Sequence, residues 1–230
     1  MSQTAKSDLL GRAPLSSAVE DYLKAIYALR EDGETVVSTQ SLANRLGVAP
    51  PSATAMLKKL DGLGLAHHEP YRGVALSPAG EKIALEVVRH HRIIETFLAE
   101  ILGLSWDKVH DEAERLEHVI SEEVEAKMAA VLGHPTHDPH GSPIPALDGA
   151  LPNSPEARLC DLKEGWTGKV TRVADENGDV LRHLSDLGLR PGSQIEVIRA
   201  VAAEGVLKLQ VAGEERIVGI APARAVWVNG

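Results

Sequence analysis

The first third of the chain carries three helical hydrophobic patterns separated by short turns. Residues 17–31 repeat apolar side chains at the three-to-four-residue spacing of an α-helix. Ser38 precedes a second helical pattern, and residues 51–62 form a third that opens with a proline. Residues 67–76 predict two short strands with a turn at Arg72 and Gly73. Three helices followed by a two-stranded wing are typical of a winged helix-turn-helix domain.

A longer helical region follows. Apolar residues recur at helical spacing from Ser77 to about Ile101, and residues 105–132 predict one or two further helices. These apolar stripes exceed what one small domain can bury, so we expect some of them to form a dimer interface. Residues 133–156 contain six prolines and no periodicity, which predicts an irregular connection at a domain boundary.

Residues 159–230 change to patterns typical of strands. Five short runs rich in β-branched residues, separated by turns, predict a small β-barrel. The chain is therefore expected to have an α+β fold. We expect a winged helix-turn-helix domain over 1–75, an all-α domain over 76–148, a linker over 149–160 and a β-barrel domain over 161–230.

Composition excludes several classes of protein. The chain has no apolar run of about 18 residues and no apolar segment near its N-terminus, so we expect neither a membrane span nor a secretory signal. Its single cysteine, Cys160, excludes a disulfide framework and a cysteine-rich zinc site, and favours a cytoplasmic location. Aromatic residues are only 3% of the chain, which argues against a platform for stacking single-stranded bases.

Acidic residues and histidines concentrate in the middle of the chain. Residues 76–155 contain 14 of the 33 acidic side chains, six of the 24 basic ones and seven of the ten histidines. Carboxylates and imidazoles without thiolates suit Mn(II), Fe(II) or Zn(II) rather than Cu(I). The spacing places several of them on shared helix faces. These candidate ligands are His91 and Glu95 on one helix, His110, Glu114, Glu117 and His118 on the next, and Glu20 and Asp21 on the first.

Other interpretations of these residues remain open. Helices carrying such charges are often solvated surfaces laced with salt bridges. A hydrolase is a further alternative, but the zinc motif His-Glu-x-x-His is absent, because Asp111 follows His110 and Glu114 stands where the second histidine belongs. No nucleophile elbow and no glycine-rich phosphate loop occur. We therefore expect no enzymatic activity, and keep a metal-dependent hydrolase and a cytoplasmic metal buffer as alternatives.

Several stretches of the chain resemble the diphtheria-toxin-repressor family of iron- and manganese-dependent transcriptional regulators. The resemblance extends from about residue 17 to the end. It rests on EDYLKAIYAL at 20–29, APPSATAMLKKLDGLGL at 49–65, YRGVALSPAG at 71–80, HHRIIETFL at 90–98, KVHDEAERLEHVISEEVE at 108–125 and LSDLGLRPGSQIEV at 184–197. It implies that the helical domain serves dimerisation and metal binding. It also implies that the last domain is SH3-like, as in proteins accessory to ferrous-iron transport.

The resemblance also implies two sets of metal ligands. Asp21, Glu114, Glu117 and His118 match the primary, activating site of the family, and His91, Glu95 and His110 match its ancillary site. Iron sensors carry methionine and cysteine at the positions of Asp21 and Glu114. The two carboxylates here match the manganese-sensing branch, and oxygen ligands favour Mn(II).

Two positions extend or depart from the family pattern. Manganese sensors with a two-metal cluster carry a glutamate where this chain has Lys24, and a charged lysine cannot bind a metal. Two separated sites are therefore expected. The third domain can donate ligands to the ancillary site in this family, and Glu176 and Asp179 are the candidates here.

The expected function is that of a regulator that Mn(II), or alternatively Fe(II), activates to bind operators of metal-homeostasis genes, mainly as a repressor of uptake. The third helix should enter the major groove of a pseudo-palindromic operator bound by a homodimer. Small side chains at its start favour groove shape and phosphate contacts over base contacts. The candidate DNA-binding residues are Thr39, Gln40, Pro51, Ser52, Thr54, Lys58, Lys59 and Arg72.

Overall fold

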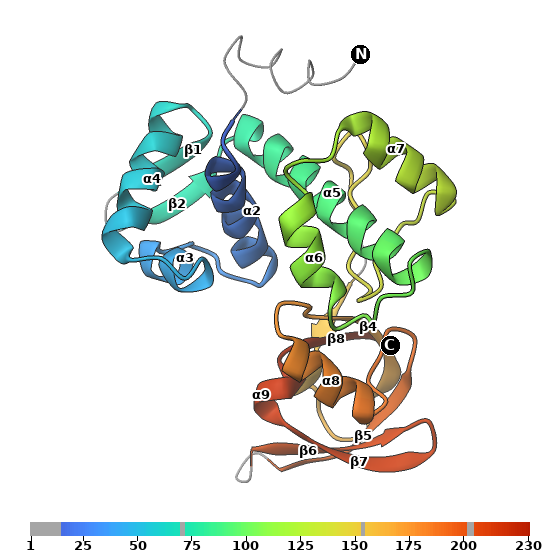
Figure 1. The fold of residues 1–230 in the computed structure, drawn as a ribbon. Helices are drawn as coiled ribbons and strands as arrows, with labels where there is room; N and C mark the ends of the chain where they lie inside the picture. The colour runs from blue at the N-terminus through green and yellow to red at the C-terminus, as the bar shows by residue number, and fades with distance from the viewer. Residues whose placement is uncertain (1–14, 70–71, 153–154, 202–204) are drawn as a thin grey trace. The chain divides into compact units, whose positions relative to one another are not determined.

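Three helices and a hairpin form the N-terminal part of the protein (Figure 1). The computed structural model describes residues 15–230 apart from 70–71, 153–154 and 202–204, so the first 14 residues of the predicted domain 1–75 lie outside the described part. The elements in order are α2 (Ser17–Glu31), α3 (Thr39–Arg45), α4 (Pro50–Gly62), β1 (Ala66–Glu69) and β2 (Gly73–Leu76). The order of elements expected for a winged helix-turn-helix domain is confirmed.

Local chemistry explains where α3 and α4 begin. The Ser38 hydroxyl accepts a hydrogen bond from the backbone N–H of Ser41 at 2.9 Å, which caps α3. Helix α4 begins at Pro50 and continues with Pro51, because a proline in the first turn lacks only an N–H that has no helical partner. Fully buried leucine and isoleucine side chains join these helices into one core. They are Leu23, Ile26, Leu42, Leu57, Leu60 and Leu65.

Helix α5 (Pro78–Glu100) follows the hairpin directly. Ser77 caps it, because the Ser77 hydroxyl accepts the backbone N–H of Gly80 and donates to the carbonyl of Gly64. Gly80 lies so close to the chain before β1 that a Cβ atom there would stand 1.9 Å from the Leu65 carbonyl oxygen. The start of α5 is thus fixed by a serine cap and a glycine contact.

The chain divides into two compact units, and α5 contributes to both. The first unit contains the described residues up to His90, together with Glu117–Ala126 and Pro145–Ala150. The second contains His91–Leu116, Lys127–Ile144 and Leu151–Gly230.

The predicted helical region 105–132 forms two helices. Helix α6 spans Val109–Leu116 and α7 spans Glu122–Val131, with a turn between them. Among the described residues, no helix is long and apolar enough to cross a membrane.

The proline-rich segment after α7 is irregular, as predicted, but it is firmly attached within the second unit. Arg92 of α5 donates to the carbonyl of Pro143, and Asp138 Oδ1 accepts the backbone N–H groups of His140 and Ser142 at 2.8 and 2.9 Å. The backbone N–H of Val173 donates to the His140 carbonyl at 2.9 Å. This segment therefore connects α5 to the C-terminal sheet.

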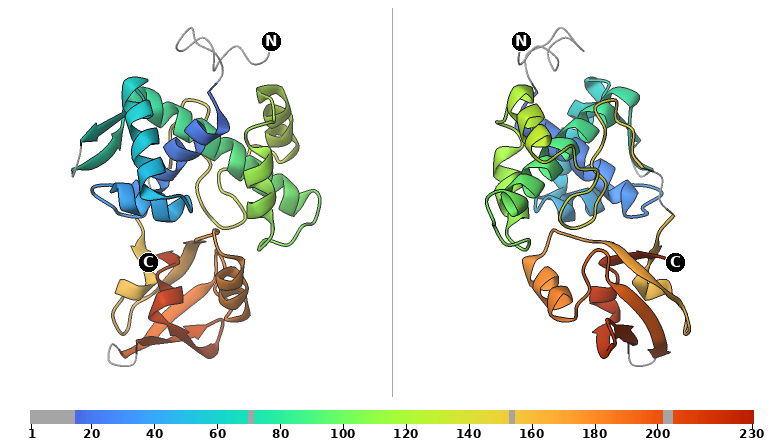
Figure 2. Two further views of the ribbon diagram at one scale, coloured as in Figure 1. Left: turned by 60° about the vertical axis from the view of Figure 1, so that its left-hand side comes forward. Right: turned by 90° about the vertical axis from the view of Figure 1, so that its right-hand side faces the viewer.

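The C-terminal residues form one antiparallel sheet with strand order β3-β8-β4-β5-β6-β7 (Figure 2). The five predicted strands are confirmed, and a two-residue strand, β3, joins them at one edge. The bounds are β3 Ala157–Arg158, β4 Thr167–Val173, β5 Gln194–Val201, β6 Val206–Val211, β7 Glu214–Gly219 and β8 Val226–Asn229. Three short helices accompany the sheet, namely η1 (Leu159–Asp161), α8 (Gly178–Asp186) and α9 (Ile220–Ala223). Register shifts in β4 and β5 allow the sheet to bend around a core of buried leucine, isoleucine and valine residues.

Gly80→Ala should destabilise the protein by about 1–3 kcal/mol, because its Cβ would collide with the backbone of Leu65. Gly62→Ala is the matched control, since a Cβ at that helical glycine meets no atom within 4 Å. The control should leave stability unchanged or raise it by up to about 1 kcal/mol. Urea unfolding followed by circular dichroism measures both variants. Equal unfolding midpoints would contradict the role assigned to Gly80.

Candidate metal centre

Two segments far apart in the sequence meet in a polar cluster of the first unit. Asp21 lies on α2, whereas Glu117 and His118 lie in the turn after α6. His118 Nε2 is 2.6 Å from Asp21 Oδ1, and His118 Nδ1 is 2.7 Å from Glu20 Oε2. The prediction that Glu117 and His118 continue the helix of Glu114 is wrong, because α6 ends at Leu116. The turn that replaces the helix directs both side chains toward α2.

Positive charge in this cluster comes from the protein itself. Both ring nitrogens of His118 face carboxylate oxygens, which only accept hydrogen bonds, so each nitrogen carries a proton. These bonds, to Asp21 first and then to Glu20, raise the pKa of His118 to about 10 against the opposing effect of burial. Lys24 Nζ lies 2.7 and 3.0 Å from the two carboxylate oxygens of the buried Glu117. A histidine proton and a lysine thus offset two of the three carboxylate charges, which leaves the cluster with a net negative charge.

Glu114, which the sequence assigns to the same set, belongs to the second unit. Its carboxylate lies 3.8 Å from His91 Nδ1 and 3.8 Å from His110 Nε2. The side chain is 43% exposed, whereas the side chains of His91 and His110 beside it are 5% and 18% exposed.

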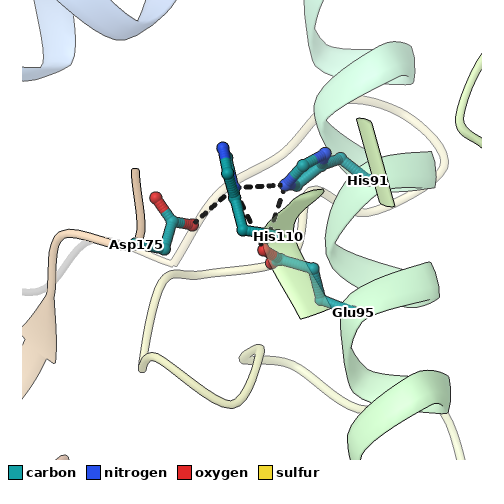
Figure 3. Close-up of side chains that lie close together, drawn as sticks. All are labelled: His91, Glu95, His110 and Asp175. Carbon is teal, nitrogen blue, oxygen red and sulfur yellow. Dashed lines mark hydrogen bonds and ion pairs between the residues drawn. The ribbon is translucent and has the colours of Figure 1, made fainter. Parts of the chain in front are cut away.

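The second cluster lies wholly in the second unit and brings together His91, Glu95, His110 and Asp175 (Figure 3). His91 and Glu95 are one turn apart on α5, and His91 Nε2 is 3.0 Å from Glu95 Oε1. His110 of α6 approaches the same oxygen at 3.4 Å, and its ring nitrogen is 3.9 Å from Asp175 Oδ2. The three ligands predicted from the sequence therefore meet around one carboxylate.

Charges in this cluster depend strongly on one another. Burial opposes ionisation of Glu95, but the nearby His91, followed by His110 and His140, outweighs it and holds the pKa of Glu95 well below its usual range. Burial likewise opposes a charge on His110, but Glu95 and Asp175 raise the pKa of His110. The carboxylates of the cluster and the imidazoles beside them therefore stabilise one another's charged forms.

Asp138 and His140 extend this cluster, and the sequence analysis missed both because they fall in the proline-rich segment. His140 is fully buried, with Nδ1 3.8 Å from Glu95 Oε2 and 3.9 Å from Asp175 Oδ2. Burial lowers the pKa of His140, but Glu95 and Asp175 outweigh it and raise that pKa to about 10. Burial, followed by the nearby Glu95, raises the pKa of Asp138 to about 7. The one signal for them in the sequence is that an aspartate and a histidine, both common metal ligands, stand two positions apart.

The C-terminal domain contributes Asp175 to the cluster, and this differs from the sequence-based candidates. The groups of described residues close enough to share an ion include Asp175 but neither Glu176 nor Asp179. The Asp179 carboxylate is 89% exposed and pairs with Arg182 on α8. Asp175 follows β4 by two residues, and the attachment of β4 to the segment around His140 brings it to the cluster.

Both clusters have the donor atoms that divalent transition metals use. Each combines carboxylate oxygens with imidazole nitrogens, and neither contains a thiol. Cys160 lies in η1, where its thiol contacts Asp161 and burial raises its pKa. In the second cluster, both Glu95 oxygens are buried without a hydrogen bond of acceptable geometry, despite their ion-pair distances. The carboxylate and imidazole donors, together with the two Glu95 oxygens that lack hydrogen bonds, fit a bound cation.

The candidate DNA-binding residues lie on or near α3, α4 and the hairpin of the first unit. Lys58 and Lys59 are exposed on α4, and Arg72 is exposed beside Glu69 in the hairpin. Gln40 is exposed at the start of α3 and donates to Asn44. Pro51 and Ser52 are exposed in the first turn of α4, while Thr39 and Thr54 are half-buried.

Comparisons with known proteins match three consecutive segments. Residues 14–74 match the model "Iron dependent repressor, N-terminal DNA binding domain", and residues 77–146 match "Iron dependent repressor, metal binding and dimerisation domain". Residues 157–229 match the FeoA domain.

Whole-chain relatives agree with these matches. The iron-dependent repressor IdeR of Mycobacterium leprae is 32% identical over 205 residues, which cover 84% of this chain and 89% of that protein. The diphtheria toxin repressor of Corynebacterium diphtheriae is 34% identical over 194 residues, covering 80% and 85%. A solved manganese-dependent transcriptional repressor in complex with manganese superposes with a TM-score of 0.88 at 38% identity, covering 91% of this chain and 98% of that one.

The fold is thus an N-terminal DNA-binding domain, a helical metal-binding and dimerisation domain and a C-terminal SH3-like β-sheet domain. The chain belongs to the diphtheria-toxin-repressor family of metal-dependent transcriptional repressors.

Proposed function

We propose that this protein is a repressor activated by Mn(II), which binds pseudo-palindromic operators of metal-uptake genes as a homodimer in the cytoplasm. The contact between Asp21 and His118 carries this proposal. It joins α2, which packs against α3 and α4 of the DNA-binding domain, to the turn that follows α6. A metal ion held there acts directly on the position of α2.

We assign Asp21, Glu117 and His118 to the activating site, with Glu114 as the fourth ligand expected from the family resemblance. His91, Glu95 and His110 form the ancillary site, together with Asp175. All of these donors are oxygen or imidazole nitrogen, which supports Mn(II) over metals that prefer sulfur. A bound Mn(II) would supply the positive charge that these carboxylates share.

The residues of the activating site must rearrange before they can bind a metal. His118 Nε2 must lose the proton that it now donates to Asp21, and Glu117 must turn from Lys24. Both events weaken the contacts that hold α2 to the turn after α6. Metal binding and the position of α2 are therefore coupled, and the strength of activation equals the difference in metal affinity between the two arrangements.

We assign α4 to the major groove of the operator. Lys58, Lys59 and Arg72, with Thr39 and Gln40, supply phosphate contacts from exposed or half-buried positions. Pro51, Ser52 and Thr54 at the start of α4 are small and permit close approach to base edges. A homodimer presents two such helices, which compensates for modest affinity in each half-site.

Asp21→Ala should preserve the fold and abolish metal-dependent operator binding, because it removes the ligand that α2 contributes. Mn(II) should then strengthen operator binding less than about twofold, against roughly 5–150-fold for a typical effector. Fluorescence anisotropy with labelled operator DNA, with and without Mn(II), measures this ratio. Glu31→Ala is the matched control, since Glu31 is an exposed acidic residue on the same helix. An Asp21→Ala protein that still needs Mn(II) to bind would refute the assignment.

Mn(II) should activate operator binding at the free concentrations found in cells, and a chelator should reverse the activation. The physical reason is that oxygen and imidazole nitrogen ligands bind Mn(II), which competes poorly for sulfur ligands. Gel shifts across Mn(II), Fe(II), Zn(II) and chelator, on the DNA upstream of the protein's own gene and on metal-uptake promoters, test this prediction. Activation by Fe(II) alone would show that the ligand argument is wrong.

Lys24→Gln should increase the affinity for Mn(II) by about tenfold, or ~1.4 kcal/mol. The substitution removes a cation that pairs with Glu117 and that repels a metal ion a few ångströms away, where charges interact by about 1–4 kcal/mol. Isothermal titration calorimetry with Mn(II) measures the change. Lys82→Gln, which removes an exposed lysine of α5, is the control. Weaker Mn(II) binding by Lys24→Gln would mean that Lys24 supports the site instead of competing for it.

A further inference from the structure

A third group of candidate ligands in the first unit shares no residue with the two clusters described above. Glu86, His90 and Glu122 each offer one ligand atom, and these atoms all lie within 4.8 Å of one another. Glu86 and His90 lie on α5, whereas Glu122 is the first residue of α7. All three residues belong to the first unit, so the group is formed within one compact body.

Helical spacing aligns the two residues of α5. Residues four positions apart on an α-helix lie on the same face, with about 5–6 Å between their Cβ atoms. Glu86 and His90 have this spacing. The zinc motif His-Glu-x-x-His uses the same spacing to hold one ion with two side chains of one helix. A third ligand must come from another element, and Glu122 of α7 is within reach.

The ring of His90 is buried, and its polar atoms are not satisfied. Only 2% of the residue is exposed, and neither Nδ1 nor Nε2 has a hydrogen bond of acceptable geometry to any described residue. Nε2 lies 3.3 Å from Oε1 of Glu122, which places the ring against the carboxylate of α7. Native proteins rarely leave a buried imidazole in this condition unless water or an ion lies beside it. This histidine distinguishes the group from an ordinary patch of acidic residues.

A neighbouring ion pair holds α7 against α5. Nη2 of Arg89 lies 2.9 Å from Oε1 of Glu125, and both side chains are largely buried. Nη1 of the same arginine donates to the carbonyl of Pro145 at 2.7 Å. Because these contacts already fix the two helices beside the group, less conformational freedom is lost when Glu122 and His90 bind the same ion.

The group is open to solvent on one side. The side chain of Glu122 is 42% exposed and Glu86 is half-buried, whereas His90 is enclosed. A metal ion can enter from the exposed side, and water can complete its coordination, as it does at zinc sites with three protein ligands. Two carboxylate oxygens and one imidazole nitrogen suit divalent transition metals, and such ligands bind Zn(II) more tightly than Mn(II).

We propose that Glu86, His90 and Glu122 bind a divalent transition-metal ion at a site separate from the activating and ancillary sites. The ion joins α5 to the start of α7. Glu122 follows His118 by four residues, so the ion also fixes the end of the turn that carries Glu117 and His118. It thereby limits the movement of that turn during activation. This consequence rests on the proposed function, whereas the binding of the ion does not.

Equilibrium dialysis against saturating Zn(II), with metal analysis of the protein, tests the proposal. Glu122→Gln should bind one ion fewer per chain than the wild type, because a neutral amide replaces an anionic ligand. Glu123→Gln is the matched control, since Glu123 is an exposed neighbour on α7 outside the group and should leave the count unchanged. His90→Gln should lose the same ion as Glu122→Gln. The Glu122 variant decides the test, because it changes a partly exposed side chain and preserves the fold.

Cadmium NMR of the cadmium-loaded protein identifies which ion is lost, because each bound cadmium ion gives its own signal. Glu122→Gln and His90→Gln should lack the same signal, and Glu123→Gln should keep it. Circular dichroism confirms that each variant is folded. An unchanged ion count and an unchanged set of signals in Glu122→Gln would overturn the proposal and leave His90 and Glu122 as an ion pair.

The same spectra separate this proposal from the proposed function. Asp21→Ala should lack a different signal from the one that Glu122→Gln lacks, since the two substitutions remove ligands of different sites. An Asp21→Ala protein that keeps every signal would contradict the activating site alone. A Glu122→Gln protein that keeps every signal would contradict the site on α5 and α7 alone.

Discussion

Carboxylates that are buried away from water dominate the chemistry of this protein. Glu117 and Glu20 are 1% and 4% exposed in the first unit, and Glu95 is fully buried in the second. An ionised carboxylate buried without a partner costs many kcal/mol, so each requires a proton, a cationic side chain or a metal ion. Lys24 and the protonated His118 serve the first cluster, and histidines serve the second. The proposed activating and ancillary sites therefore lie where buried carboxylates already require a compensating positive charge.

Elements governed by local rules could be predicted from the sequence. Helix α2 has the predicted bounds because its apolar spacing is regular, and α3 begins where the Ser38 hydroxyl can cap it. The five longer strands of the C-terminal sheet also follow from pattern and turns, whereas β3 has only two residues and exists through its pairing with β8. His91 and Glu95 could be found together because they lie one turn apart on a single helix.

Residues brought to the clusters by irregular segments could not be predicted in the same way. The continuous helical pattern across 105–132 conceals the end of α6 at Leu116, so the turn carrying Glu117 and His118 was not foreseen. His140 lies in a proline-rich segment without periodicity, and its position depends on hydrogen bonds to Trp106 and Val173. The sequence analysis named Glu176, which is one position after Asp175. The pairing of β4 decides which of the two residues reaches the cluster. These contacts are tertiary, and spacing along the chain does not encode them.

Lys24 gives the activating cluster a property that its ligands alone would not have. A set of buried carboxylates without an internal cation would bind any available divalent ion tightly and remain occupied, which is unsuited to sensing. An ammonium group 2.7 Å from Glu117 and a proton on His118 instead stabilise these carboxylates from within the protein. In the proposed mechanism, a metal ion must displace both positive charges before α2 can change partners, so Lys24 and the His118 proton would set the metal concentration at which the protein responds. The same reasoning explains why a lysine can stand among candidate ligands without being one.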